Sequence, residues 1–182
     1  TPRHTIAMLS AFLGKLGISS ASVGSDEPPS GPTLETGAHV WCLAQHDGFL
    51  FAGDAAGAVH TWQLNGAGDS ATYLGKVGAH EGTVYALLVW SGAMVTAGTD
   101  GLCSWRLGAA SALPERAARA ACEPGCPPML ALANGGMRGE RLYSGGADGR
   151  VTRWAIGVDG ALASDVATDV HASVTFYALA VV

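Results

Sequence analysis

The stretch LYSGGADGRVTRW (residues 142–154) holds a Leu-Tyr pair, a Gly-Gly, an Asp-Gly and one Trp. Looser copies lie upstream, as LFAGDAAGAVHTW at 50–62 and MVTAGTDGLCSW at 94–105. Each copy passes from a β-type run through a Gly-containing turn to an aliphatic residue three positions before Trp. Two short β-type runs joined by such a turn favour a β-hairpin. The chain is therefore predicted to build one hairpin several times.

The copies recur at a regular spacing. The tryptophans that end them lie 43 and 49 residues apart, at Trp62, Trp105 and Trp154. Another β-type run precedes each copy and a last one starts the series again, at 39–44, 83–89, 129–133 and 174–182. A period of roughly 40–50 residues with one Trp per unit is typical of repeat architectures. We therefore expect an all-β chain from residue 37 onward.

In this order of strands, turns and Trp, residues 37–182 resemble the WD-repeat β-propeller family. The resemblance implies one four-stranded blade per unit, with strand a innermost and strand d outermost. It predicts about three blades and the first strand of a fourth, at 37–78, 79–127, 128–170 and 171–182. The repeats are degenerate, because no Trp is followed by the Asp that is frequent in the family. Because such a set does not close a ring, we expect another chain or segment to complete it.

The family also carries a polar network in each blade, which joins a His before strand a, a Ser or Thr on strand b, the turn Asp and the Trp. The second unit supplies all four candidates: His80, Thr96, Asp100 and Trp105. The third unit lacks the His and offers Ser144, Asp148 and Trp154. The first unit has Ala at two of the four places and offers His39 and Trp62. Buried polar groups need partners, so we expect structural roles for all of these residues.

Two details of the strands follow from local residue types. In the third copy, Leu142 and Tyr143 are expected to end strand b, and Asp148-Gly149 to make the turn into strand c. The segment 108–128 is too long and too rich in Pro for an ordinary outer strand and loop. It is interpreted as an insertion with one helical turn near 115–121.

The N-terminal part differs from the rest of the chain in its residue pattern. Apolar residues at helical spacing in 5–17 predict a short docking helix or extended segment within residues 1–18. The content of Ser, Gly and Pro in residues 19–36 predicts a linker. No apolar run reaches the roughly 18–20 residues of a membrane span, so none is expected.

Composition narrows the classes of function. The formal net charge is −5 and no Lys/Arg stripe is present, which argues against direct binding of nucleic acid. With only four cysteines and 48% apolar residues, a packed core is expected in place of a disulfide scaffold. An intracellular, cytoplasmic location is therefore expected. A weaker similarity is to the WD repeats of plant CCCH zinc-finger proteins, through VWCL at 40–43 and HEGTVYALLV at 80–89, but the chain has no such finger.

Catalytic signatures are missing from the sequence. Neither a GxSxG elbow nor a GxxxxGK[ST] loop occurs. A structural zinc site needs four ligands, usually as two pairs. The two cysteines of CEPGC at 122–126 have no second pair of Cys or His after them, so neither a metal nor a cofactor is expected. The chain is therefore predicted not to be an enzyme.

Aromatic residues recur at one place in strand a. Trp41, Tyr85 and Tyr177 occupy it, and Leu130 fills it in the third unit. Aromatic residues are good interface anchors, so the three aromatics are candidate partner-binding residues, with packing between blades as the alternative. The predicted function is a non-catalytic scaffold for other proteins. A structural subunit of a ribonucleoprotein or ciliary assembly and the substrate-recognition part of a ubiquitin ligase are the alternatives.

Overall fold

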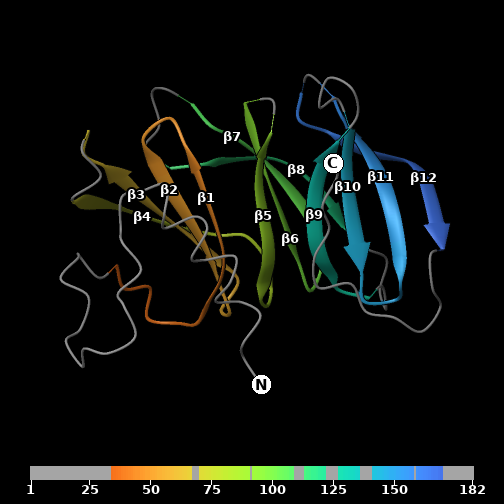
Figure 1. The fold of residues 1–182 in the computed structure, drawn as a ribbon, viewed down its shortest axis with the longest axis horizontal. Helices are drawn as coiled ribbons and strands as arrows, with labels where there is room; N and C mark the ends of the chain where they lie inside the picture. The colour runs from red at the N-terminus through yellow and green to blue at the C-terminus, as the bar shows by residue number, and fades with distance from the viewer. Residues whose placement is uncertain are drawn as a thin grey trace, which may run out of the picture.

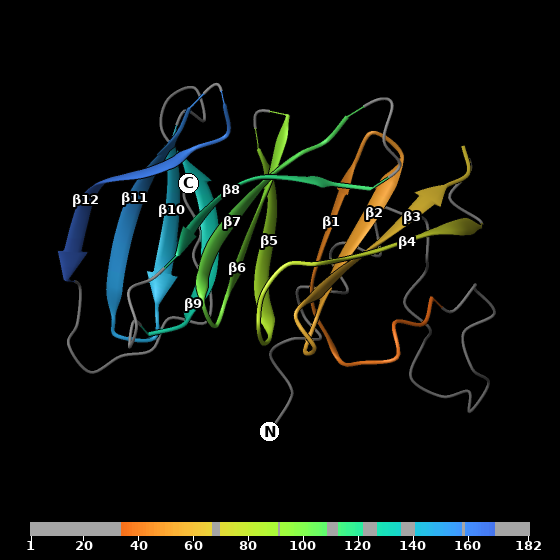
Figure 2. The same cartoon turned by 180° about the vertical axis from the view of Figure 1, so that it is seen from behind.

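The computed structural model describes residues 34–66, 70–90, 92–108, 113–121, 127–135, 141–157 and 159–169. Within these ranges the chain is all-β and contains no helix. It forms three four-stranded antiparallel sheets that stand side by side like propeller blades (Figures 1 and 2). The helix expected in 1–18 and the strand expected at 171–182 lie outside the described residues.

Each sheet is a meander in which the strands pair in chain order. The first sheet holds β1 (Val40–His46), β2 (Phe49–Asp54), β3 (Ala58–Leu64) and β4 (Ala71–Gly78). The second holds β5 (Val84–Trp90), β6 (Ala93–Gly98), β7 (Gly101–Arg106) and β8 (Glu115–Ala121). The third holds β9 (Met129–Gly135), β10 (Arg141–Gly146), β11 (Arg150–Ile156) and β12 (Leu162–Asp169). The first strands of the sheets, β1, β5 and β9, are neighbours in space (Figure 1).

Two local expectations were wrong. Residues 115–121 form strand β8 in place of a helical turn, because their backbone groups pair with β7, as at Trp105 and Arg116. This pairing overrides the helical preference of an Ala-rich segment. Leu142 and Tyr143 lie near the start of β10 and not at its end, since β10 continues to Gly146 before the turn.

The three sheets share two β-bulges at equivalent positions. In the inner strand the register shifts over one unpaired residue, which is Trp41, Tyr85 or Leu130. Between strands c and d the register shifts beside Trp62, Trp105 or Trp154. A bulge bends the strand and re-aims the side chain that it leaves unpaired. The repeat is therefore present in the backbone as well as in the sequence.

The core between the first two sheets is apolar. Phe51 and Val59 of the first sheet pack in one buried cluster with Met94 and Trp105 of the second. The Cys42 thiol donates to the carbonyl oxygen of Val84 across the same interface, at 3.6 Å. Burial of this apolar surface holds the two sheets together.

Candidate functional site

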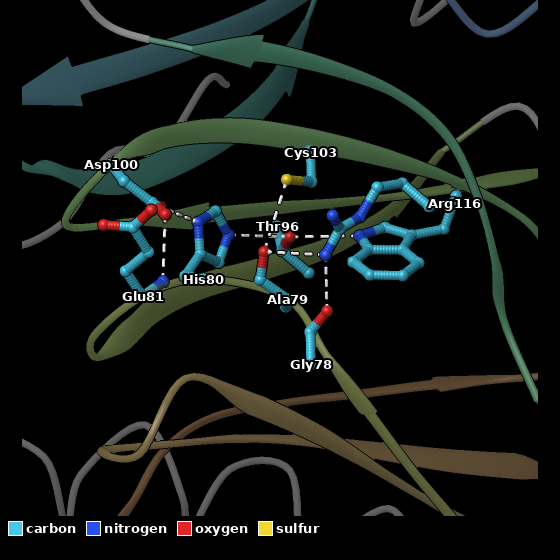
Figure 3. Close-up of polar contacts among 9 residues, drawn as sticks. Gly78, Ala79, His80, Glu81, Thr96, Asp100, Cys103 and Arg116 are labelled. Carbon is cyan, nitrogen blue, oxygen red and sulfur yellow. Dashed lines mark hydrogen bonds and ion pairs between the residues drawn. The ribbon is translucent and has the colours of Figure 1, made fainter.

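The structure brings together the four polar residues of the second unit (Figure 3). His80 precedes β5, Thr96 lies on β6, Asp100 in the turn and Trp105 on β7. Trp105 Nε1–H donates to Thr96 Oγ1 at 3.1 Å, and Thr96 Oγ1 lies 2.9 Å from His80 Nε2. His80 Nδ1 bonds to the Asp100 carboxylate, which also accepts from the backbone N–H of Glu81 at 2.9 Å.

The donors and acceptors of this chain assign the His80 tautomer. The indole can only donate, and an ionised carboxylate can only accept. In a neutral imidazole, His80 Nδ1 therefore carries the proton toward Asp100, and Nε2 accepts from the Thr96 hydroxyl. Every polar atom along the path from Trp105 to Asp100 then has a partner, so the network ties the start of one blade to its own b–c hairpin.

Glycine is required beside this network. A Cβ added at Gly98 would lie 2.5 Å from Cγ of the His80 ring, closer than non-bonded carbon atoms approach. Gly98 thus makes room for the imidazole. Gly98 therefore has a steric role here, in addition to any role in the turn.

Arg116 on β8 links the second blade to the first. Its guanidinium donates to the carbonyl oxygens of Gly78 and Ala79, the latter at 3.3 Å, and lies 5.1 Å from the centroid of the Trp105 ring. A cation over an indole face is attracted by the ring quadrupole. The sequence analysis did not single out Arg116, because its hydrogen-bond partners are backbone carbonyls at the end of the first blade.

The third sheet has a reduced network. Trp154 Nε1–H donates to Ser144 Oγ at 2.8 Å, and Ser144 Oγ–H contacts Met129 Sδ at 3.5 Å. Asp148 instead accepts from the backbone N–H of Arg150 at 3.1 Å, within its own turn. The Trp154–Ser144 pair and Asp148 are therefore not joined in one network in this blade, because no His precedes its inner strand to connect them.

The first sheet contains a different network from the one expected. His39 is exposed and contributes its backbone carbonyl, which accepts from the N–H of Ala55 at 2.8 Å. The structural role expected of His39 is therefore filled by its backbone, while its side chain is exposed. His60 on β3 takes part instead, with Nε2 3.0 Å from Asp54 Oδ2 and Nδ1 3.1 Å from the Tyr73 hydroxyl.

The Asp54 group is closely packed and satisfied. Asp54 and His60 are both buried, and Asp54 Oδ1 also accepts from the backbone N–H of Ala56 and of Ala58. The His60, Trp62 and Tyr73 rings pack together with centroids 5.4–5.9 Å apart. Asp54 occupies the position that Gly98 holds in the second sheet. Among the described residues before β1, no imidazole fills the adjacent space, so the Asp54 carboxylate fits there. In the sequence, this pair could have been recognised as an Asp and a His six residues apart, on the two strands of one predicted hairpin.

The bulge residues form an aromatic pair at the ends of the inner strands. Trp41 is 50% exposed, and its ring meets the Tyr85 ring edge to face, with centroids 5.7 Å apart. Leu130 occupies the equivalent bulge of β9. Tyr177, the third predicted aromatic residue, lies outside the described residues. The pair therefore spans the first two blades and remains accessible.

In the described part of the chain, no group of three or more His, Cys, Asp or Glu side chains could hold a metal ion. Burial raises the pKa of the Cys42 thiol to about 12, which keeps it protonated. Among the described residues, no helix is long and apolar enough to cross a membrane.

Comparison with known proteins supports the fold. No protein-family model and no curated protein matches the chain. Solved structures do match, among them the WD40 repeats of RRP9, with a TM-score of 0.63, 15% identity and coverage of 81% of this chain and 43% of that one. Sqt1 of Saccharomyces cerevisiae matches with a TM-score of 0.61 and 18% identity, over 75% of this chain and 36% of its own. The computationally designed Ika4 matches with a TM-score of 0.60 and 23% identity, over 79% of this chain and 80% of its own.

These similarities define the class of fold. At such identities they show that the described residues form three blades of a WD-repeat-like β-propeller. The chain spans less than half the length of Sqt1 and of the RRP9 WD40 repeats.

Proposed function

We propose that the protein is a non-catalytic interaction module that binds a protein partner through Trp41 and Tyr85. The observation that carries the proposal is the accessible aromatic pair, held at equivalent bulges of two blades. Large rigid aromatic side chains dominate the binding energy of many interfaces. A bulge at each position aims the side chain out of the regular strand pattern, which suits recognition.

The test is the double variant W41S/Y85S of the full chain, compared with Q45S, which changes an exposed residue on the same strand. Partners captured from a lysate by the wild-type chain are identified by mass spectrometry, and their affinity is then measured with purified proteins. We expect W41S/Y85S to weaken binding about 30-fold or more, which corresponds to a hot spot of roughly 2 kcal/mol. The thermal midpoint should stay near that of Q45S.

Two results would contradict the proposal. Unchanged affinity would show that the aromatic pair does not contact the partner. Loss of the cooperative thermal transition would assign Trp41 and Tyr85 to packing between blades. The identity of the captured proteins also separates the alternative roles, since a ribonucleoprotein or ciliary assembly and a ubiquitin ligase differ in composition.

We also propose that another chain or segment completes the ring of which the described residues form three blades. The exposed side chains of Val40 and Tyr73 on the first sheet support this proposal.

A further inference from the structure

The turn of residues 54–57, named here the Asp54 turn, is hydrogen-bonded to the segment before the inner strand β1. Its Ala55 N–H donates to the carbonyl oxygen of His39 at 2.8 Å. Asp54 itself pairs with the residue that precedes Trp41 in β1. Trp41 then follows as the unpaired residue of the bulge. The backbone that leads into Trp41 is therefore held by this turn.

The same turn is hydrogen-bonded to the segment before the next inner strand, β5. The Ala55 carbonyl oxygen accepts from the hydroxyl of Thr83 at 3.4 Å, two residues before Tyr85. The Gly57 carbonyl oxygen accepts from the backbone N–H of His80 at 3.0 Å. A Cβ at Gly57 would collide with the backbone oxygen of His80, so the turn and this segment lie in close contact. One turn thus holds the approaches to both aromatic residues.

The Asp54 carboxylate stabilises the turn. Its Oδ1 accepts from the N–H of Ala56 at 2.9 Å and of Ala58 at 2.8 Å, and its Oδ2 lies 3.0 Å from His60 Nε2. An Asp side chain that binds nearby backbone groups in this way favours a turn conformation. Because Asp54 is only 1% exposed, removing its carboxylate would leave these N–H groups without their acceptor.

We propose that Asp54 is a positioning residue for the aromatic pair of Trp41 and Tyr85. The two rings belong to different sheets, so their edge-to-face contact at 5.7 Å depends on how β1 and β5 are placed relative to each other. The Asp54 turn is bonded to the approach of each strand, and the carboxylate holds the turn. The consequence for partner binding rests on the proposed function, whereas the geometry of the pair is testable without a partner.

Fluorine NMR of the full chain labelled with 5-fluorotryptophan tests the positioning role. The chain has five Trp residues, and the resonance that is missing in W41S belongs to Trp41. Y85S removes the neighbouring ring, so the Trp41 resonance in Y85S is the reference for a disrupted pair. D54A should move the Trp41 resonance toward this reference. D54N should leave it near the wild-type position, because its amide oxygen still accepts from the two backbone N–H groups.

S144A is the control for a general loss of stability. It removes the acceptor of Trp154 Nε1–H in the third sheet and leaves the Asp54 turn unchanged. Spectra are recorded well below the thermal midpoint of each variant. S144A should then move the Trp154 resonance and leave that of Trp41 in place.

G57A takes the place of D54A if D54A does not fold. It keeps the carboxylate and places a methyl group against the backbone oxygens of the segment before β5. G48A is its control, since Gly48 also has a positive φ but has open space around it. G57A should move the Trp41 resonance, and G48A should not.

Two NMR results would overturn the inference: a folded D54A or G57A with an unchanged Trp41 resonance, or S144A moving this resonance as far as D54A does. With a purified partner, D54A should weaken binding about 10-fold in the wild-type background and less than about 2-fold in W41S/Y85S. Equal weakening in both backgrounds would also overturn it. If W41S/Y85S binds as the wild type does, the proposed function fails, and the NMR result still decides the positioning role.

Discussion

Thr96 offers a direct test of the polar network in the second blade. Its hydroxyl accepts from Trp105 Nε1–H and donates to His80 Nε2, so T96V removes both bonds at nearly constant volume. Thr61 on β3 provides a matched control. It is also fully buried, but its hydroxyl is the buried side-chain polar atom without a partner among the described residues.

The expected loss of unfolding free energy depends on which buried groups lose a hydrogen-bond partner in each variant. T96V removes the acceptor of a buried indole N–H and the Thr96 hydroxyl beside a buried imidazole nitrogen, and each such loss costs about 1–3 kcal/mol. We therefore expect T96V to lower the free energy of unfolding by roughly 2–6 kcal/mol. T61V removes a hydroxyl that was desolvated without compensation, so the change should lie within about 0.5 kcal/mol of zero or be stabilising.

The assay is equilibrium unfolding in urea, followed by tryptophan fluorescence and far-UV circular dichroism. Equal slopes for the wild type and both variants allow their unfolding free energies to be compared. If T96V cost no more than T61V, the hydrogen bonds of Thr96 would contribute nothing net, and the network would not stabilise the blade.

Two further predictions concern backbone and thiol. G57A should destabilise the protein more than G48A, by about 1–3 kcal/mol in urea unfolding: both Gly residues have positive φ, but only at Gly57 would a Cβ lie 2.2 Å from a backbone oxygen, that of His80. Equal losses would refute this clash. Cys42 should resist alkylation at pH 8 until the chain unfolds, as shown by peptide mapping, because burial raises its pKa from 9.0 to about 12. Since the unfolded chain loses this proton first, Cys42 should make stability fall as the pH rises from 9 toward 12, an effect absent in C42A.

Much of the fold was predictable from local pattern. A Gly-containing turn followed at fixed distance by an aliphatic residue and Trp predicted the b–c hairpins of all three sheets. These features are local, because the turn needs residues that tolerate its dihedral angles and the strands need alternating side chains. Residues 115–121 were misassigned since their pairing with β7 depends on a partner strand and not on their own composition.

The site depended more strongly on tertiary structure. Family spacing alone brought His80 and Trp105 into consideration, whereas the Asp54–His60 pair was missed because its members occupy positions that are Gly98 and Cys103 in the second blade. Whether a side chain is exposed is also not local, as Val40 and Val84 show by their opposite exposure in equivalent places. The sequence by itself determined the repeated hairpin, through turn chemistry and strand alternation. The tertiary structure decided which polar atoms meet and which faces are covered, since both depend on how one sheet packs against the next.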